Sequence, residues 1–90
     1  MALDLDAVQV FLKVAELGSF TRAASQLGLA KSRASLVVQA LEKDLGARLL
    51  QRTTRSVALT EEGEVFAARA RALAGEAEEL STLFSAASTL

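Results

Sequence analysis

The pattern of apolar and polar positions divides the first half of the chain into helical segments separated by glycines. In the first segment, apolar residues recur every three or four positions, as on one face of a helix: Leu5, Val8, Phe11, Leu12 and Ala15. Asp4 or Asp6 can cap the start of this helix. Gly18 can end it, because glycine has no Cβ to clash in a left-handed turn.

Two further helices are predicted to meet across a short turn. One covers residues 20–27, between Ser19 as its cap and Gly28 as its stop, and the other covers residues 31–45. The residues expected to pack on the inner sides of these helices are apolar: Ala23, Ala24, Leu27, Leu29, Ala34, Val38, Leu41 and Leu45. Two helices joined by about three or four residues form a helix-turn-helix.

After residue 46 the pattern changes from helical to alternating. Residues 49–52 and 56–59 are predicted to form two short strands, joined by the tip Thr53-Thr54-Arg55. The hairpin pattern is weaker than one with an Asn-Gly turn, so a plain loop over residues 51–56 is the alternative. The order of elements, three helices and then two strands, is typical of a mainly α, winged helix-turn-helix domain over residues 1–59.

The last third of the chain, residues 60–90, is predicted to be one long helix running to about residue 87. Thr60 can cap it, and three glutamates in the first turn favour its positive end. Its apolar residues alternate at spacings of four and three: Phe66, Ala70, Leu73, Ala77, Leu80, Phe84 and Ala87. This heptad pattern predicts a homodimer in which the helix pairs with its copy. A helix folded wholly onto its own domain is the alternative.

Composition excludes several kinds of chemistry. The chain has no His and no Cys, so zinc sites built on imidazole or thiolate, histidine relays and cysteine nucleophiles are excluded. No metal or cofactor is expected. The absence of cysteine fits a reducing, cytoplasmic setting, and neither a membrane span nor a signal peptide is evident. A small enzyme using carboxylates is a rival hypothesis, but no cluster of acids supports it.

The charges are unevenly distributed, although the net charge is −1. Residues 17–58 contain seven basic and two acidic residues, and the two flanks together contain three basic and nine acidic residues. An uneven but merely solvated surface would also show this pattern. A basic segment that coincides with a helix-turn-helix favours contact with nucleic acid.

The outer face of the predicted helix 31–45 carries the side chains that suit a DNA groove. The residues of this face are Ser32, Arg33, Ser35, Leu36, Gln39 and Lys43. They supply hydroxyls, an amide and positively charged groups, and no acid occurs in this helix before Glu42. Arg52 and Arg55 on the hairpin suit a minor groove or its phosphates. Either set can also be an ordinary solvated surface, but the order helix, helix, hairpin favours double-stranded DNA as the partner.

Three runs of residues carry a resemblance to a known family. They are Phe11-Leu-Lys-Val-Ala-Glu-Leu-Gly-Ser-Phe-Thr-Arg-Ala-Ala-Ser-Gln-Leu, Leu41-Glu-Lys-Asp-Leu-Gly-Ala-Arg-Leu-Leu-Gln-Arg-Thr-Thr-Arg and Leu59-Thr-Glu-Glu-Gly. With these runs the chain resembles the N-terminal domain of LysR-type transcriptional regulators over nearly its whole length. The resemblance implies a winged helix-turn-helix with a long linker helix that pairs with that of a partner.

The resemblance also implies which residues contact DNA. The helix 31–45 would enter the major groove, the hairpin would lie at the minor groove, and the start of the second helix would touch the backbone. The expected contacts are Ser19, Thr21, Arg22, Lys31, Ser32, Arg33, Ser35, Leu36, Gln39, Arg52, Thr54 and Arg55. Leu36 departs from the arginine common in the family, which predicts either an apolar contact such as a thymine methyl or weaker binding. Ala30 departs from the usual Ser or Pro.

The resemblance further implies an effector-binding domain, which this sequence does not contain, so we expect the chain to be a DNA-binding fragment; an unusually truncated regulator is the alternative. Full-length members can assemble further, as tetramers. The main rival hypothesis is a protein–protein interaction module that acts through the long helix alone.

Overall fold

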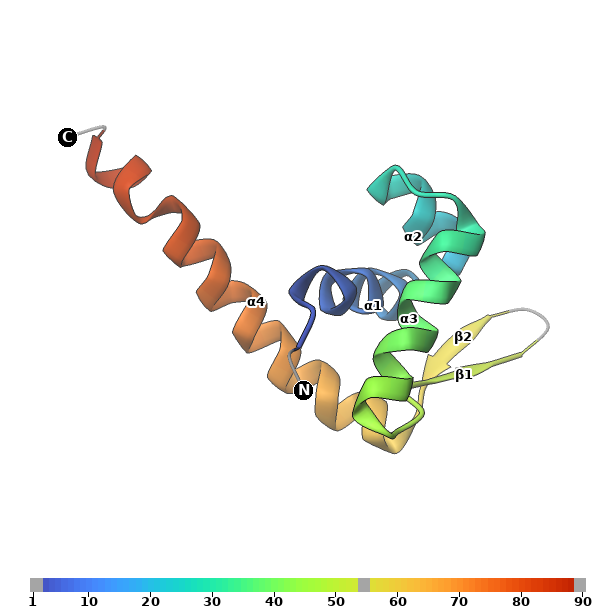
Figure 1. Ribbon diagram of the computed structural model, residues 1–90. Helices are drawn as coiled ribbons and strands as arrows, with labels where there is room; N and C mark the ends of the chain where they lie inside the picture. The colour runs from blue at the N-terminus through green and yellow to red at the C-terminus, as the bar shows by residue number, and fades with distance from the viewer. Residues whose placement is uncertain (1–2, 54–55, 89–90) are drawn as a thin grey trace.

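The computed structural model describes residues 3–53 and 56–88. Over these residues it contains four helices and two strands, in the order α1 (Leu5–Leu17), α2 (Phe20–Leu27), α3 (Lys31–Leu45), β1 (Leu50–Arg52), β2 (Val57–Leu59) and α4 (Glu61–Ser88) (Figure 1). The three short helices pack together, the two strands form a wing beside α3, and α4 extends away from them. This is the predicted winged helix-turn-helix followed by a long C-terminal helix.

The first two helices begin at the expected capping residues. Asp4 Oδ1 accepts hydrogen bonds from the backbone N–H groups of Asp6 and Ala7, at 3.0 and 3.3 Å. Ser19 Oγ accepts one from the N–H of Arg22 at 3.1 Å. The helix α3 begins at Ala30, which supplies no such bond. Each of these three helices ends at a glycine with a left-handed backbone, and the turn after α2 uses Gly28 with a φ of 71°.

The core lies where the three short helices meet the wing and the first part of α4. Its largest fully buried side chains are Phe11, Leu49, Val8, Val14 and Val38. Phe11 meets the edge of Phe66 from α4, with the ring centroids 5.5 Å apart. Ala67 and Ala70 of α4 are also buried, so the first part of this helix belongs to the core of the domain.

The wing is a two-stranded antiparallel hairpin in which Leu50 pairs with Leu59 and Arg52 pairs with Val57. Each strand begins one residue later than predicted, at Leu50 and at Val57. The backbone N–H of Thr53 donates to the carbonyl of Ser56 at 2.9 Å, which closes the hairpin beyond the strands. A hairpin is therefore correct, and the alternative of a plain loop is wrong.

The wing is joined to both α3 and α4 by hydrogen bonds. Glu42 Oε2 on α3 accepts from the backbone N–H groups of Leu49 and Leu50, at 2.7 and 3.1 Å. Thr60 Oγ1 caps α4 by accepting from the N–H of Gly63 at 2.9 Å, and its hydroxyl donates to the carbonyl of Arg48. These bonds fix where the chain leaves α3 and where it enters α4.

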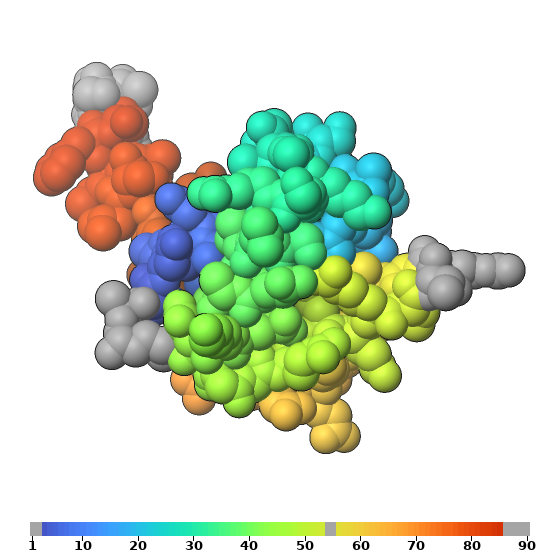
Figure 2. Space-filling model, turned by 45° about the vertical axis from the view of Figure 1, so that its right-hand side comes forward, coloured from blue at the N-terminus to red at the C-terminus, as the bar shows by residue number. Residues whose placement is uncertain are grey.

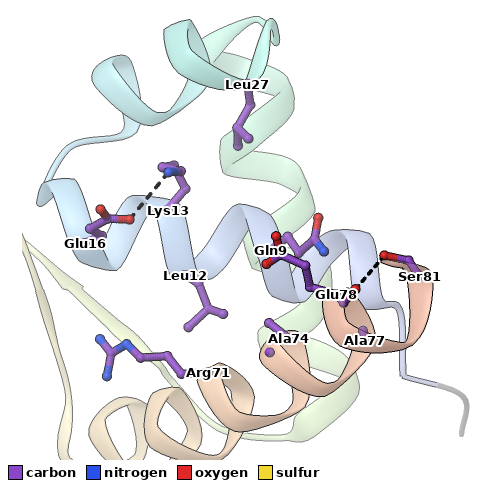
Figure 3. A pocket seen from close by; sticks show the side chains of 11 residues that line it. Gln9, Leu12, Lys13, Glu16, Leu27, Arg71, Ala74, Ala77, Glu78 and Ser81 are labelled. Atoms are coloured by element: carbon purple, nitrogen blue, oxygen red, sulfur yellow. Dashed lines mark hydrogen bonds and ion pairs between the residues drawn. The ribbon is translucent and has the colours of Figure 1, made fainter. Parts of the chain in front are cut away.

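One predicted inner residue lies elsewhere. Leu27 was expected between α2 and α3, but its side chain is 37% exposed. It lines a surface groove that also involves Leu12 of α1 and Ala74 of α4 (Figure 3). Leu27 is the last residue of α2. The contact between the helices is filled one turn earlier by Ala23 and Ala24, which are both buried.

Candidate DNA-binding interface

The outer face of α3 lies open to solvent across one side of the molecule. Ala34, Val38 and Leu41 are buried, and the helical repeat therefore turns the opposite side outward. The exposed side chains on that side are Ser32, Leu36, Gln39 and Lys43, and Leu36 is 61% exposed. Lys31, also exposed, lies in the first turn of α3 at the edge next to the wing. Figure 2 shows α3 in green along this side, with α2 next to it and the wing in yellow at its edge.

Two of the predicted contact residues lie on opposite flanks of this face. Arg33 is exposed and lines a shallow hollow together with Leu36, Asp4 and Asp44. Ser35 is half-buried and lies on the flank next to the wing, where it contacts Arg52. The predicted contacts of α3 thus form one continuous strip, with a guanidinium at one edge and a hydroxyl at the other.

Arg52 connects the wing to both helices of the helix-turn-helix. Its guanidinium carbon lies 4.3 Å from the centroid of the Phe20 ring, at the start of α2. Its Nη2 donates a hydrogen bond to Ser35 Oγ at 3.0 Å. The sequence indicated Arg52 as a DNA contact but neither of these partners, because no local pattern joins Arg52 to Ser35, seventeen positions away, or to the still more distant Phe20.

A small hollow of about 220 Å³ lies beside Arg52, between the start of α2, the start of α3 and the wing. Its lining combines basic side chains with hydroxyl groups, and it includes Ser19, Thr21, Lys31, Arg52, Thr53 and Ser56. The first turn of α2 borders this hollow, and a helix N-terminus favours anions. Arg22, also at the start of α2, is exposed. This combination suits a backbone phosphate of DNA.

The predicted dimer residues divide into two groups along α4. Ala70 is 4% exposed and Phe66 is half-buried against Phe11, so both face their own domain. Leu73, Leu80 and Phe84 are 41%, 73% and 79% exposed. Ala77 is half-buried at the edge of the groove shown in Figure 3.

Thr54 and Arg55, the predicted contacts at the tip of the wing, lie outside the described residues.

A surface groove of about 820 Å³ lies between α1 and the second half of α4 (Figure 3). Glu16 and Glu78 both line it, but Glu16 forms an ion pair with Lys13 at 3.5 Å. Glu78 lies on the other side of the groove, beside Ser81, whose hydroxyl donates to the Glu78 carbonyl. The groove therefore does not bring the carboxylates together as a catalytic pair would require.

Residues 3–53 and 56–88 offer no support for two other kinds of function, metal binding and membrane spanning. Within these ranges no three acidic side chains come together as a metal site would need. Among the helices described, none has the length and apolar character needed to cross a membrane.

The fold and the exposed basic strip define a winged helix-turn-helix DNA-binding domain. The chain belongs to the lysR family of bacterial regulatory helix-turn-helix proteins, whose model matches residues 5–64. Membership places it among DNA-binding regulators and not among enzymes. The resemblance seen in the three sequence runs is confirmed.

Relatives are similar over most of this chain. The transcriptional regulator YhjC of Escherichia coli is 50% identical over 80 residues, which cover 89% of this chain and 27% of YhjC. The regulator CrgA of Neisseria meningitidis serogroup B is 46% identical over 76 residues, covering 84% of this chain and 25% of CrgA. The chain therefore spans about a quarter of the length of these relatives.

Solved structures of similar fold include complexes with DNA. The DNA-binding domain of BenM, in complex with the catB site 1 DNA, has a TM-score of 0.88 at 32% identity. That match covers 97% of this chain and 98% of the other. DarR of Vibrio fischeri, in complex with DNA, has a TM-score of 0.88 at 27% identity and covers 99% of this chain and 30% of DarR. The fold is thus that of domains solved in complex with DNA.

Proposed function

We propose that this chain reads specific DNA sequences by placing α3 in the major groove and the wing at the minor groove. The observation that carries the proposal is the exposed strip on α3, which has hydroxyls, an amide and bases on the side opposite its buried residues. Hydroxyl and amide groups match the hydrogen-bond donors and acceptors on nucleobase edges, and the positively charged side chains match the phosphates. The residues assigned to this contact are Ser19, Thr21, Arg22, Lys31, Ser32, Arg33, Ser35, Leu36, Gln39, Arg52, Thr54 and Arg55.

We also propose that the chain divides into a DNA-binding part, residues 1–59, and a linker helix, residues 60–90, that pairs with its copy. The exposed apolar side chains of Leu73, Leu80 and Phe84 support this pairing, because three large apolar groups on one helix favour burial. A dimer presents two copies of α3, and their separation would match one helical turn of DNA, roughly 34 Å. In the whole protein, the domain would serve a cytoplasmic transcriptional regulator.

A mobility-shift assay with a random DNA pool tests DNA binding directly. We expect retention at low salt and a steep loss of affinity as salt rises, because each neutralised phosphate releases counterions. Selection of bound sequences should yield inverted half-sites. An interaction module that acts through α4 alone predicts no retention of DNA at any salt concentration, and this result would contradict the proposal.

Arg33→Ala gives the matching test of the α3 strip. We expect it to lower affinity for selected sites by roughly tenfold, as is typical for loss of one charged contact of about 1–3 kcal/mol, with the thermal midpoint unchanged because Arg33 is exposed. Arg69→Ala is the control, since Arg69 is exposed on α4. Equal effects of the two substitutions would show that Arg33 acts only through net charge.

A further inference from the structure

We propose that Arg52 is a positioning residue, which polarises the Ser35 hydroxyl so that it donates more readily than it accepts toward a base edge in the major groove. The wing would then contribute to sequence reading through α3 as well as through its own contacts. This inference rests on the proposed function, because it requires that α3 faces the bases.

The guanidinium of Arg52 is held by contacts on two different helices. One face of the group lies 4.3 Å from the centroid of the Phe20 ring, and Phe20 is only 6% exposed. A buried ring is a fixed platform, and a planar guanidinium stacks on it in a defined orientation. With its plane set by Phe20, the group directs Nη2 to Ser35 Oγ at 3.0 Å. Its position is therefore determined before DNA arrives.

This contact decides how the Ser35 hydroxyl can bond. A serine hydroxyl has one proton to donate and two lone pairs that accept, whereas a guanidinium has only donors. Ser35 Oγ must therefore be the acceptor in the bond with Arg52. Among the described residues the Ser35 side chain has no further partner, so its proton and its second lone pair remain available. The positively charged donor polarises the hydroxyl, which makes it a better donor and a poorer second acceptor. A hydroxyl at this flank of α3 would otherwise donate or accept equally well.

A hydroxyl polarised toward donation discriminates between base edges. In the major groove, guanine N7 and O6, adenine N7 and thymine O4 accept hydrogen bonds, whereas the amino group of cytosine N4 only donates. We therefore expect Ser35 to favour an acceptor and to disfavour cytosine at one position in each half-site. A serine free to rotate would tolerate both kinds of base edge.

Base-preference profiles of four variants test the inference. Sites are first selected with the unmodified chain. Each base pair of a half-site is then varied in competition assays with Arg52→Lys, Ser35→Ala, Ser35→Thr and the double variant that combines Arg52→Lys with Ser35→Ala. Lysine keeps the charge but lacks the planar group that stacks on Phe20. Arg69→Lys is the matched control, and circular dichroism shows whether each variant is folded.

We expect Ser35→Ala and Arg52→Lys to lose the preference at the same base pair, by about 3- to 10-fold, the range for one net hydrogen bond. The double variant should lose no more than either single one, and Ser35→Thr should retain the preference because it keeps the hydroxyl. If Arg52→Lys instead weakens binding equally on all sequences, Arg52 is only a phosphate contact and the inference is wrong. If the unmodified chain binds no DNA, the proposed function itself fails.

Discussion

Glu42 is one of two acidic side chains on the otherwise basic α3, and the structure gives it a structural role. Its carboxylate accepts two backbone hydrogen bonds, from the N–H groups of Leu49 and Leu50. These two groups lie just before and at the start of β1, where the strand ladder leaves them without backbone partners. A charged acceptor makes each bond stronger than a neutral one would.

Glu42→Ala is expected to destabilise the domain by about 1–3 kcal/mol, because it leaves two partly buried N–H groups without their acceptor. Chemical denaturation measures this loss. Asp44→Ala is the control, since Asp44 lies two residues further along α3 and is exposed. A similar loss of stability for both variants would mean that helix charge, and not the bond to β1, is responsible.

The sequence predicts single residues well where the relevant partner is close in the chain. Asp4, Ser19 and Thr60 each bond to an N–H group two or three residues away, and all three were predicted as caps. The bonds of Glu42 and Arg52 span seven and seventeen residues. They depend on how β1 packs against α3, which no local pattern encodes. The sequence therefore indicated Arg52 only as a DNA contact and gave no sign of its partners within the protein.

Among the elements, the helices were predicted more accurately than the strands. The bounds of α2 and α3 agree with the prediction because each lies between a start residue and a glycine in left-handed conformation. Each strand was predicted one residue too long, since the ends of a three-residue strand depend on pairing with its neighbour. Leu27 shows the same limit, because its helical spacing fits the core but the end of α2 faces a groove.

The two glycines of α4 look alike in the sequence and differ in the structure. A Cβ at Gly63 would lie 2.0 Å from the carbonyl oxygen of Leu49, whereas a Cβ at Gly75 would have no atom within 4 Å. A glycine inside a helix usually weakens it, so the two positions would be expected to behave alike. Gly63 is instead what allows α4 to approach the wing closely, and only Gly75 is a weak point.

Alanine at these two positions should therefore act in opposite directions. Gly63→Ala is expected to destabilise the domain by about 1–3 kcal/mol, because the backbone of Leu49 must move. Gly75→Ala should stabilise the helix by about 0.5–1 kcal/mol, through its better helix propensity. Thermal unfolding of both variants checks this prediction. Destabilisation of equal size in both would show that the approach to Leu49 is not what distinguishes them.

At the scale of the whole molecule, α4 has two parts with different surroundings. Its first part is packed into the core through Ala67 and Ala70, and its second part extends from the domain with large apolar groups exposed (Figure 1). This explains the molecule's elongated extents of 51 × 27 × 20 Å. The heptad pattern runs through both parts, so the sequence could not show where packing onto the chain's own domain ends.

Leu80→Asp is expected to convert the proposed dimer to a monomer, because a charge in the apolar seam of α4 loses its hydration on pairing. Leu80 is 73% exposed in the single chain, so the fold itself should be unaffected. Sedimentation velocity measures the change. Thr82→Asp is the control, since Thr82 is also exposed but lies off the seam. A dimer that persists with Leu80→Asp would refute pairing through this helix.

The hydrogen bonds of Glu42 and Arg52 join the wing to α3 at two separate points along the strand. A wing attached twice has little freedom to swing toward or away from the helix, so the distance between the two elements is set by the protein. Any mismatch with the groove must then be met by the duplex, which bends or narrows at an energetic cost that depends on its sequence. Base pairs that the protein never touches would consequently influence affinity through their stiffness.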